Sequence, residues 1–184
     1  TTITSILRSN TLPEMEFTND KDIATKLSGA GSLNVEVKEG KTVNWDTQYG
    51  VQQGGTLTFE GAGHVKLTDG TTGGTGAGIA ADIINRMTGN SLQIDGVDVT
   101  GDVTNTALGH MIWTDGTSVT GTLINDGLFD IQNGDFTLTT SINDTAVDGT
   151  LGTLNIGDGT NTTTVNAGSY SIAQNQINIL DNGT

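Results

Sequence analysis

The sequence predicts an all-β protein whose chain coils into a parallel β-helix, or β-solenoid, with one short inserted helix. Three observations predict this fold: a composition of strand and turn residues, a five-residue element that recurs along the chain, and turn signals too close together for long strands. An antiparallel β-sandwich or jelly roll is the alternative, because the same turn signals also join hairpins.

The composition favours strands joined by tight turns around a thin core. Gly accounts for 27 of the 184 residues, and Thr, Asn and Asp are also frequent. Thr suits strands, whereas Gly, Asn and Asp accept the backbone angles of tight turns. Only 4% of the residues are aromatic, so aliphatic side chains must fill most of the core. A chain of this length fits one main domain with an appended arm.

The charge and the missing cysteines exclude several classes of function. The formal net charge is −14 and no Lys or Arg follows Arg86, so the chain lacks the basic patch that neutralises nucleic-acid phosphates. No apolar run approaches the roughly 20 residues of a membrane span, which argues against membrane insertion. The absence of Cys excludes disulfides and is common in exported bacterial surface proteins. We therefore expect a secreted, extracellular protein.

Residues 1–29 differ from the rest and predict an N-terminal arm made of a strand and a helix. TTITSI predicts an extended strand that could be lent to the open sheet edge of another copy of the chain. The segment NDKDIATKLSG predicts a short helix, because Asn19 or Asp20 can cap it and Ile23 and Leu27 share one face. The candidate assembly residues are Thr1, Thr2, Ile3, Thr4, Ser5 and Ile6.

A five-residue element recurs in residues 30–184 and predicts the solenoid domain. Its form is Gly or Asn, Ser or Thr, Leu or Tyr, a variable residue, and usually Val, Phe or Ile. The Gly makes a corner, and the third and fifth residues point inward because strand side chains alternate. Unequal intervals between copies are typical of stacked coils with variable loops. The copies are GSLNV at 31–35, GTLTF at 55–59, NSLQI at 90–94, GTLIN at 121–125, GTLNI at 152–156 and GSYSI at 168–172.

Turn signals limit the strand length and favour the solenoid over the sandwich. Asp126-Gly127 and Asn133-Gly134 lie only seven positions apart. Asp-Gly and Asn-Gly are strong hairpin signals, which supports the sandwich. However, turns this close leave strands of about four or five residues, which are short for a sandwich but normal for the sides of a solenoid coil.

The segment AGIAADIINRMTG predicts the inserted helix, near residues 79–88. Ile79, Ile83 and Met87 recur at intervals of four, with Ile84 beside them, and so form an apolar helical stripe. We expect this helix to lie over one side of the solenoid or to cap an open end.

Acidic residues supply the candidate binding sites. Asp95, Asp98 and Asp102 crowd the stretch IDGVDVTGD, and hard cations need several oxygen ligands at once, so these residues are the candidate calcium ligands. We expect no cofactor: solvated turn carboxylates are the plainer interpretation of these residues, and calcium is the alternative. The same carboxylates near Trp113 give a second functional hypothesis, a carbohydrate-binding or carbohydrate-active β-helix, because paired carboxylates hydrolyse glycosides. No catalytic residue is assigned, and we expect a protein without enzymatic activity.

The G-[ST]-L-x-[VIF] element with its Asp-Gly and Asn-Gly corners resembles the passenger regions of bacterial autotransporters and filamentous-haemagglutinin-type adhesins. The likeness covers residues 30–184. It implies a right-handed parallel β-helix on a cell surface, with flat faces for adhesion or self-association. We therefore expect a non-enzymatic adhesin or a subunit of a self-assembling filament or biofilm matrix. The expected partners are further copies of the chain, surface glycans or host and cell-surface receptors.

Overall fold

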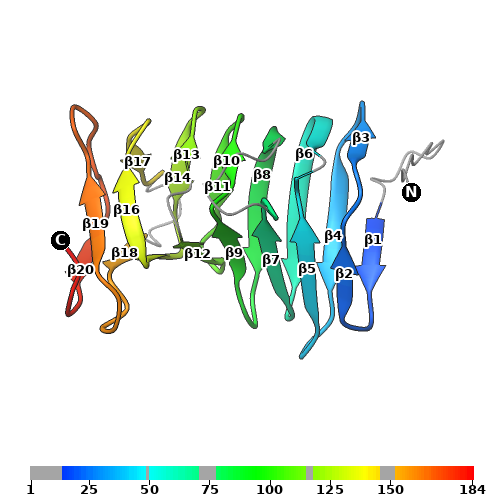
Figure 1. Cartoon of the computed structure of the whole chain (residues 1–184), viewed down its shortest axis with the longest axis horizontal. Coiled ribbons are helices and arrows are strands. Elements are labelled where there is room, and N and C mark those ends of the chain that lie inside the picture. Colours follow the sequence, from blue (N-terminus) through cyan, green and yellow to red (C-terminus); the bar gives the residue numbers. More distant parts are fainter. Residues whose placement is uncertain (1–13, 49, 71–77, 115–117, 146–151) are drawn as a thin grey trace.

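The protein is a stack of coils, a parallel β-solenoid, with β1 in the coil at one end and β20 in the coil at the other (Figure 1). The computed structural model describes residues 14–48, 50–70, 78–114, 118–145 and 152–184. Every strand pair in these ranges is parallel, which confirms the predicted solenoid and excludes the antiparallel sandwich or jelly roll.

Three sheets form the sides of the stack, and successive coils add strands to the same sheets. Sheet A runs in the order β1 (Glu14–Phe17), β4 (Leu33–Val37), β6 (Val51–Gly61), β8 (Ile79–Met87), β11 (Val103–Asn105), β14 (Leu123–Asn125) and β17 (Ile142–Asn143), with β3 (Leu27–Gly29), β10 (Asp98–Val99) and β13 (Ser118–Val119) beside this path. Sheet B runs in the order β2 (Lys21–Ile23), β5 (Thr42–Asp46), β7 (His64–Thr68), β9 (Leu92–Asp95), β12 (His110–Thr114), β15 (Leu128–Gln132), β18 (Thr153–Ile156) and β20 (Gln176–Ile179). Sheet C pairs β16 (Gly134–Thr137) with β19 (Thr163–Asn166).

The core lies between the sheets and is built from ranks, by which we mean residues in register on successive coils. Strand side chains alternate between the two faces of a sheet, so every second residue points inward. One inward rank of sheet B places an apolar residue on every coil, and all its members but the last are buried. That rank is Ile23, Trp45, Leu67, Ile94, Trp113, Ile131, Ile156 and Ile179.

Copies of the recurring five-residue element lie at the start of strands or within them, in both sheet A and sheet B. Its Leu residues in sheet A, such as Leu33, Leu57 and Leu123, are buried, as are those in sheet B. The leading Gly is required where stacked corners touch: a Cβ on Gly121 would overlap the carbonyl oxygen of Gly101 in the previous coil. The copy at 168–172 departs from the pattern, because Tyr170 is exposed and its strand is reduced to a single bridge from Ile172.

The inserted helix predicted near residues 79–88 is wrong: this segment is the strand β8 in sheet A. Alternate residues of β8 are buried, including Ile79, Ile83 and Met87, whereas Ala80 is exposed and Ile84 lies on the outer side. An interval of four is a multiple of the strand period of two, so the apolar stripe fits a strand as well as a helix. The described residues contain no helix with the length and hydrophobicity of a membrane span.

The helix predicted over residues 19–29 is also wrong, and the proposed boundary between an arm and the solenoid moves with it. Residues 21–23 and 27–29 are the strands β2 and β3. Together with β1, they pair in parallel with β4, β5 and β6. Residues 14–29 therefore belong to the solenoid, because Ile23 and Leu27 point into its core.

Candidate functional site

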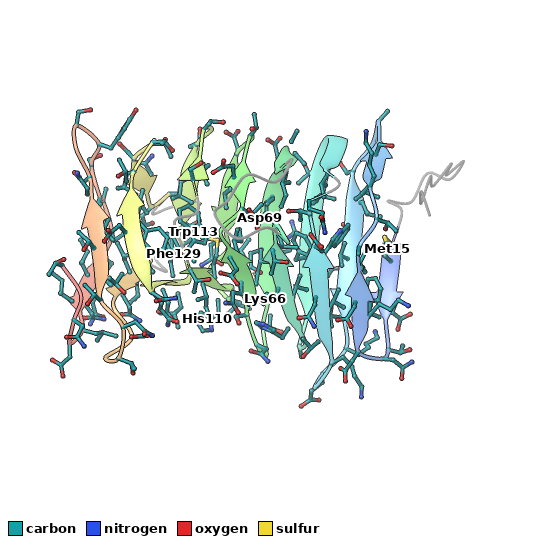
Figure 2. The ribbon with its side chains drawn as sticks, in the orientation of Figure 1. Met15, Lys66, Asp69, His110, Trp113 and Phe129 are labelled. Atoms are coloured by element: carbon teal, nitrogen blue, oxygen red, sulfur yellow. The ribbon has the colours of Figure 1, made fainter. Side chains whose placement is uncertain are left out.

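The outer face of sheet B carries the densest group of interacting polar side chains, and we call it the sheet B face. Lys66 and His110 lie on this face in the middle of the stack (Figure 2). Parallel strands lie about 4.8 Å apart, so residues of one rank come within hydrogen-bonding reach of each other. A central outward rank contains Asp22, Asn44, Lys66, Gln93, Ile112, Asp130, Asn155 and Asn178.

Lys66 and Asp95 form an ion pair on the sheet B face. Lys66 Nζ lies 2.7 Å from Asp95 Oδ2, and the two side chains are 34% and 24% exposed. The Thr114 hydroxyl donates to Asp95 Oδ1 over 2.7 Å, and Gln93 Nε2 donates to Thr114 Oγ1 over 3.4 Å. The contacts span β7, β9 and β12, so this cluster joins three successive coils. It presents a cation, a carboxylate and an amide to solvent, whereas Thr114 is buried.

His110 and Asp130 form a second pair one coil further along. His110 Nε2 lies 2.8 Å from Asp130 Oδ2. Asn155 Nδ2 donates to Asp130 Oδ1 over 2.7 Å, and Asn178 Nδ2 donates to Asn155 Oδ1 over 2.7 Å. The side chains of β12, β15, β18 and β20 are thus linked along the stack axis.

His64 lies in the same outward rank as Ser91 and His110. Its Nδ1 is 3.0 Å from the Ser91 hydroxyl. Burial lowers the pKa of His64, with the charge of Lys66 acting in the same direction, so the imidazole is neutral at neutral pH. A serine beside a histidine suggests a nucleophile, but Ser91 is only 2% exposed. The contact between His64 and Ser91 therefore joins two coils, and the Ser91 hydroxyl is not accessible to a substrate.

The three predicted calcium ligands lie on different sides of the stack. Asp95 is outward on sheet B, whereas Asp98 is in β10 of sheet A and Asp102 precedes β11. Asp98 Oδ1 accepts from the Ser118 hydroxyl over 2.5 Å, and Asp102 Oδ1 accepts from the backbone N–H of Thr122 over 2.7 Å. Within the described ranges, no group of three His, Asp or Glu residues is arranged to hold a metal ion.

Asp102 belongs to a corner rank in which a side-chain oxygen accepts the backbone N–H of the next coil. Asp82 Oδ1 accepts from Asp102 N over 2.9 Å, and the Ser32 hydroxyl accepts from Thr56 N over 3.2 Å. Ser141 does the same for Ser171 over 3.0 Å. These contacts satisfy backbone donors at the corners, where the sheet ladder is interrupted. Several acidic residues of the repeats therefore connect coils.

A buried asparagine ladder fills a corner of the core. Asn85, Asn105 and Asn125 lie 20 residues apart and are completely buried. Each side-chain amide donates to the next Asn Oδ1 over 2.7 Å, and Gln174 ends the ladder by accepting from Asn125 over 2.5 Å. The ladder was not predicted from the sequence. Its signal is three asparagines at an exact interval of 20 residues, of which Asn125 takes the place of the usual Val, Phe or Ile in the copy at 121–125.

Trp113, the aromatic residue of the carbohydrate hypothesis, lies in the core and is closed to a sugar. The ring is 2% exposed and packs edge to face on Phe129, with centroids 4.7 Å apart (Figure 2). The cavity beside it, also lined by Phe136 and Leu138, measures about 10 Å³, which is room for about one water molecule. The indole N–H groups of Trp113 and Trp45 are buried without a hydrogen-bond partner among the described residues.

The N-terminal edge of sheet A is charged. Lys38 Nζ lies 3.1 Å from Glu16 and 2.5 Å from Glu36, and so connects β1 to β4. The hydrogen bond from Lys38 lowers the pKa of Glu36, and a hydrogen bond with Glu36 raises the pKa of Glu14. Glu14, Glu16 and Lys38 thus put charges of both signs on this edge.

The C-terminal end of the stack is apolar. Ile177 and Ile179 of β20 are in register with the buried Leu154 and Ile156 of β18, but they are 45% and 63% exposed. Among the strands that the structure describes, β20 pairs only with β18. Leu180 adds a further exposed apolar side chain. The core ranks of sheet B therefore open to solvent at this end.

The candidate assembly residues Thr1 to Ile6 lie outside the described residues, so the strand assigned to them stays a prediction. Comparisons of the chain with protein-family models, with curated proteins and with solved structures find no match.

Proposed function

We propose that this protein is a non-enzymatic, extracellular structural protein that acts as an adhesin or as a subunit of a self-assembling surface fibre or matrix. The observation that carries the proposal is the arrangement of polar side chains in ranks along the outer face of an eight-stranded parallel sheet. Hydrogen bonds link Asn155 to Asp130 and Asn178 to Asn155 along the stack axis. Such a surface is flat, regular and held rigidly, as repetitive contact with a partner surface requires.

The outer carboxylates support the same proposal. A general acid or base must reach a substrate, whereas Asp98, Asp102 and Asp130 each accept hydrogen bonds from a neighbouring coil. These side chains stabilise the stack.

Negative-stain microscopy and analytical ultracentrifugation of the concentrated chain test the assembly branch. Fibres or concentration-dependent oligomers are the expected result. A variant lacking residues 1–10 tests the lent strand: loss of assembly supports a role for Thr1 to Ile6, and unchanged assembly removes it. Isolated particles that also fail to bind cell or abiotic surfaces would refute the structural role.

A second candidate, glycan binding at the sheet B face, is favoured by the cluster of Lys66, Asp95, Thr114 and Gln93. Lys66, Asp95 and Gln93 offer both donors and acceptors to solvent on one flat surface, which suits sugar hydroxyl groups. Glycan-array binding that is lost in Lys66→Ala, and kept in Lys41→Ala as a control for charge, would support it. Release of reducing or unsaturated sugar ends would instead show an enzyme and contradict the non-enzymatic proposal.

A further inference from the structure

We propose that a groove at one corner of the stack binds an acidic, N-acetylated sugar residue of a surface glycan through Arg86 and Leu108. The inference rests on the adhesin branch of the proposed function, and it gives that branch a ligand class and a site away from the sheet B face. Three features carry it: the volume of the groove, an arginine without an ion pair, and the apolar and hydroxyl groups around that arginine.

The groove lies between the corners of two neighbouring coils. Strands β8 and β11 pair in the middle of the stack (Figure 1). The end of β8 and the corner after it supply Arg86 and Thr88, and the turn between β11 and β12 supplies Thr106, Ala107 and Leu108. The cavity between them measures about 340 Å³. Ligand sites measure about 300–1,000 Å³, so the groove has room for one sugar ring with its substituents.

The turn that forms one wall of the groove is held in place before any ligand binds. Thr106 donates to the carbonyl oxygen of Asn85 twice, from its backbone N–H over 3.1 Å and from its hydroxyl over 2.9 Å. Gly109 N donates to the carbonyl oxygen of Thr106 over 2.7 Å, which closes the turn around Ala107 and Leu108. Leu108 is nevertheless 76% exposed. The turn therefore presents a leucine to solvent at a fixed position, so little conformational entropy is lost when a ligand covers it.

Arg86 supplies the positive charge of the groove. Its side chain is exposed and forms no ion pair with any residue that the structure describes, whereas Lys38 and Lys66 are both paired with carboxylates. A guanidinium presents its N–H donors in one plane and binds a carboxylate through a bidentate pair of hydrogen bonds. The other residues that line the groove are uncharged. A ligand carboxylate is therefore the group that complements this site.

The remaining groups of the groove fit a sugar that carries an acetamido group. Leu108 and Ala107 offer apolar contact to the acetamido methyl group. The exposed Thr88 hydroxyl can donate or accept, whereas the Thr106 hydroxyl already donates to Asn85 and keeps only its capacity to accept. Sugar hydroxyl groups serve both. A fatty acid would use neither threonine, and a neutral sugar would leave the guanidinium without a carboxylate, so the acidic N-acetylated sugar is the ligand that uses every group.

Glu60 opposes the binding of an anion and so offers a test by improvement. It is in register with Arg86 on β6, the strand on the other side of β8 from the groove. Its charge disfavours a second carboxylate beside the guanidinium. Glu60→Gln should therefore tighten the binding of the acidic sugar about twofold or more at low ionic strength, and it should leave the binding of a neutral sugar unchanged.

Saturation-transfer NMR with four probes tests the ligand class. The methyl glycoside of N-acetylneuraminic acid carries both a carboxylate and an acetamido group, those of glucuronic acid and N-acetylglucosamine carry one each, and octanoate represents a fatty acid. We expect the first probe to bind about tenfold more tightly than the other three, with the strongest transfer to its acetamido methyl group. Equal or tighter binding of any other probe would overturn the assignment.

Substitutions in the groove test the site. Arg86→Ala should weaken binding of the N-acetylneuraminic acid glycoside by at least about tenfold, and Arg86→Lys should weaken it less, because the ammonium keeps the charge without the planar fork. Leu108→Asn should weaken binding and reduce the transfer to the acetamido methyl group. Lys26→Ala is the matched control, because Lys26 is also exposed, and the affinity should not change. Unchanged affinity in Arg86→Ala would overturn the inference.

The outcomes separate this inference from the proposed function. A wild-type chain that forms fibres or adheres to surfaces without binding the acidic sugar overturns the groove assignment and leaves the structural role in place. Binding that is lost in Lys66→Ala and kept in Arg86→Ala places glycan recognition on the sheet B face and also overturns the groove assignment. A chain that neither assembles nor binds any surface or glycan overturns both the inference and the proposed function.

Discussion

Replacing Asn105 by Ala tests whether the buried asparagine ladder holds the middle coils together. Asn105 is completely buried, and its side-chain amide donates to Asn125 Oδ1 and accepts from Asn85 Nδ2, over 2.7 Å each. Each buried donor or acceptor left without its partner costs about 1–3 kcal/mol. The substitution should therefore lower the free energy of unfolding by roughly 2–6 kcal/mol, a large share of the roughly 5–15 kcal/mol that stabilises a typical domain.

Asn155→Ala is the matched control for this experiment. Asn155 makes the same in-rank contacts, donating to Asp130 and accepting from Asn178 over 2.7 Å each, but it lies on the sheet B face, where water replaces a lost partner. Asn155→Ala should lower the free energy of unfolding by at most about 1 kcal/mol. Urea unfolding followed by circular dichroism gives both values. Equal destabilisation by Asn105→Ala and Asn155→Ala would refute the argument that burial makes the ladder important.

Three further predictions concern β8, a corner and a histidine. Ile83→Ala should lower the free energy of unfolding by about 2–5 kcal/mol because it leaves a cavity in the core, whereas Ile84→Ala on the outer side should lower it by less than about 1 kcal/mol. Similar values for the two variants in urea titrations would contradict the strand assignment. Gly121→Ala should destabilise by about 1–3 kcal/mol because its Cβ overlaps the previous coil, while Gly31→Ala, with open space around its Cβ, should keep the wild-type melting temperature. Burial lowers the pKa of His64 in the folded state below its ordinary 6.5, so on acidification the unfolded chain binds a proton before the folded chain does, and the free energy of unfolding should fall as the pH drops below about 6.5. His64→Gln should weaken this pH dependence. An NMR titration that gives His64 a pKa above 6.5 would contradict the prediction.

The two predicted helices show where local sequence patterns are ambiguous. Ile79, Ile83 and Met87 recur at intervals of four, which satisfies a helix and also a strand. The decision came from contacts with distant parts of the chain: β8 pairs with β6 on one side and with β11 on the other. A helix at this place would leave the ladders of both neighbours unpaired, and that cost outweighs any local helical preference.

In the candidate site, too, the sequence shows the residue types, whereas the tertiary structure decides which side chains meet. The residue types of the sheet B face were visible in the sequence, but the partner of Lys66 was not, since Asp95 lies on the next coil, beyond strand β8. The same applies to His110 and Asp130. The sequence places Trp113 near the acidic residues of the carbohydrate hypothesis. Its position in the inward rank instead placed the ring in the core.

By itself the sequence determined the solenoid, because closely spaced corner residues permit only short strands and the returning Leu residues require a common interior. Only the tertiary structure decided which polar side chains meet, since the coil lengths vary and set the register of each rank. It also decided which apolar residues remain exposed: Ile177 and Ile179 have the same alternating pattern as the buried Leu154 and Ile156, and they differ only in having no coil beyond them in the described stack.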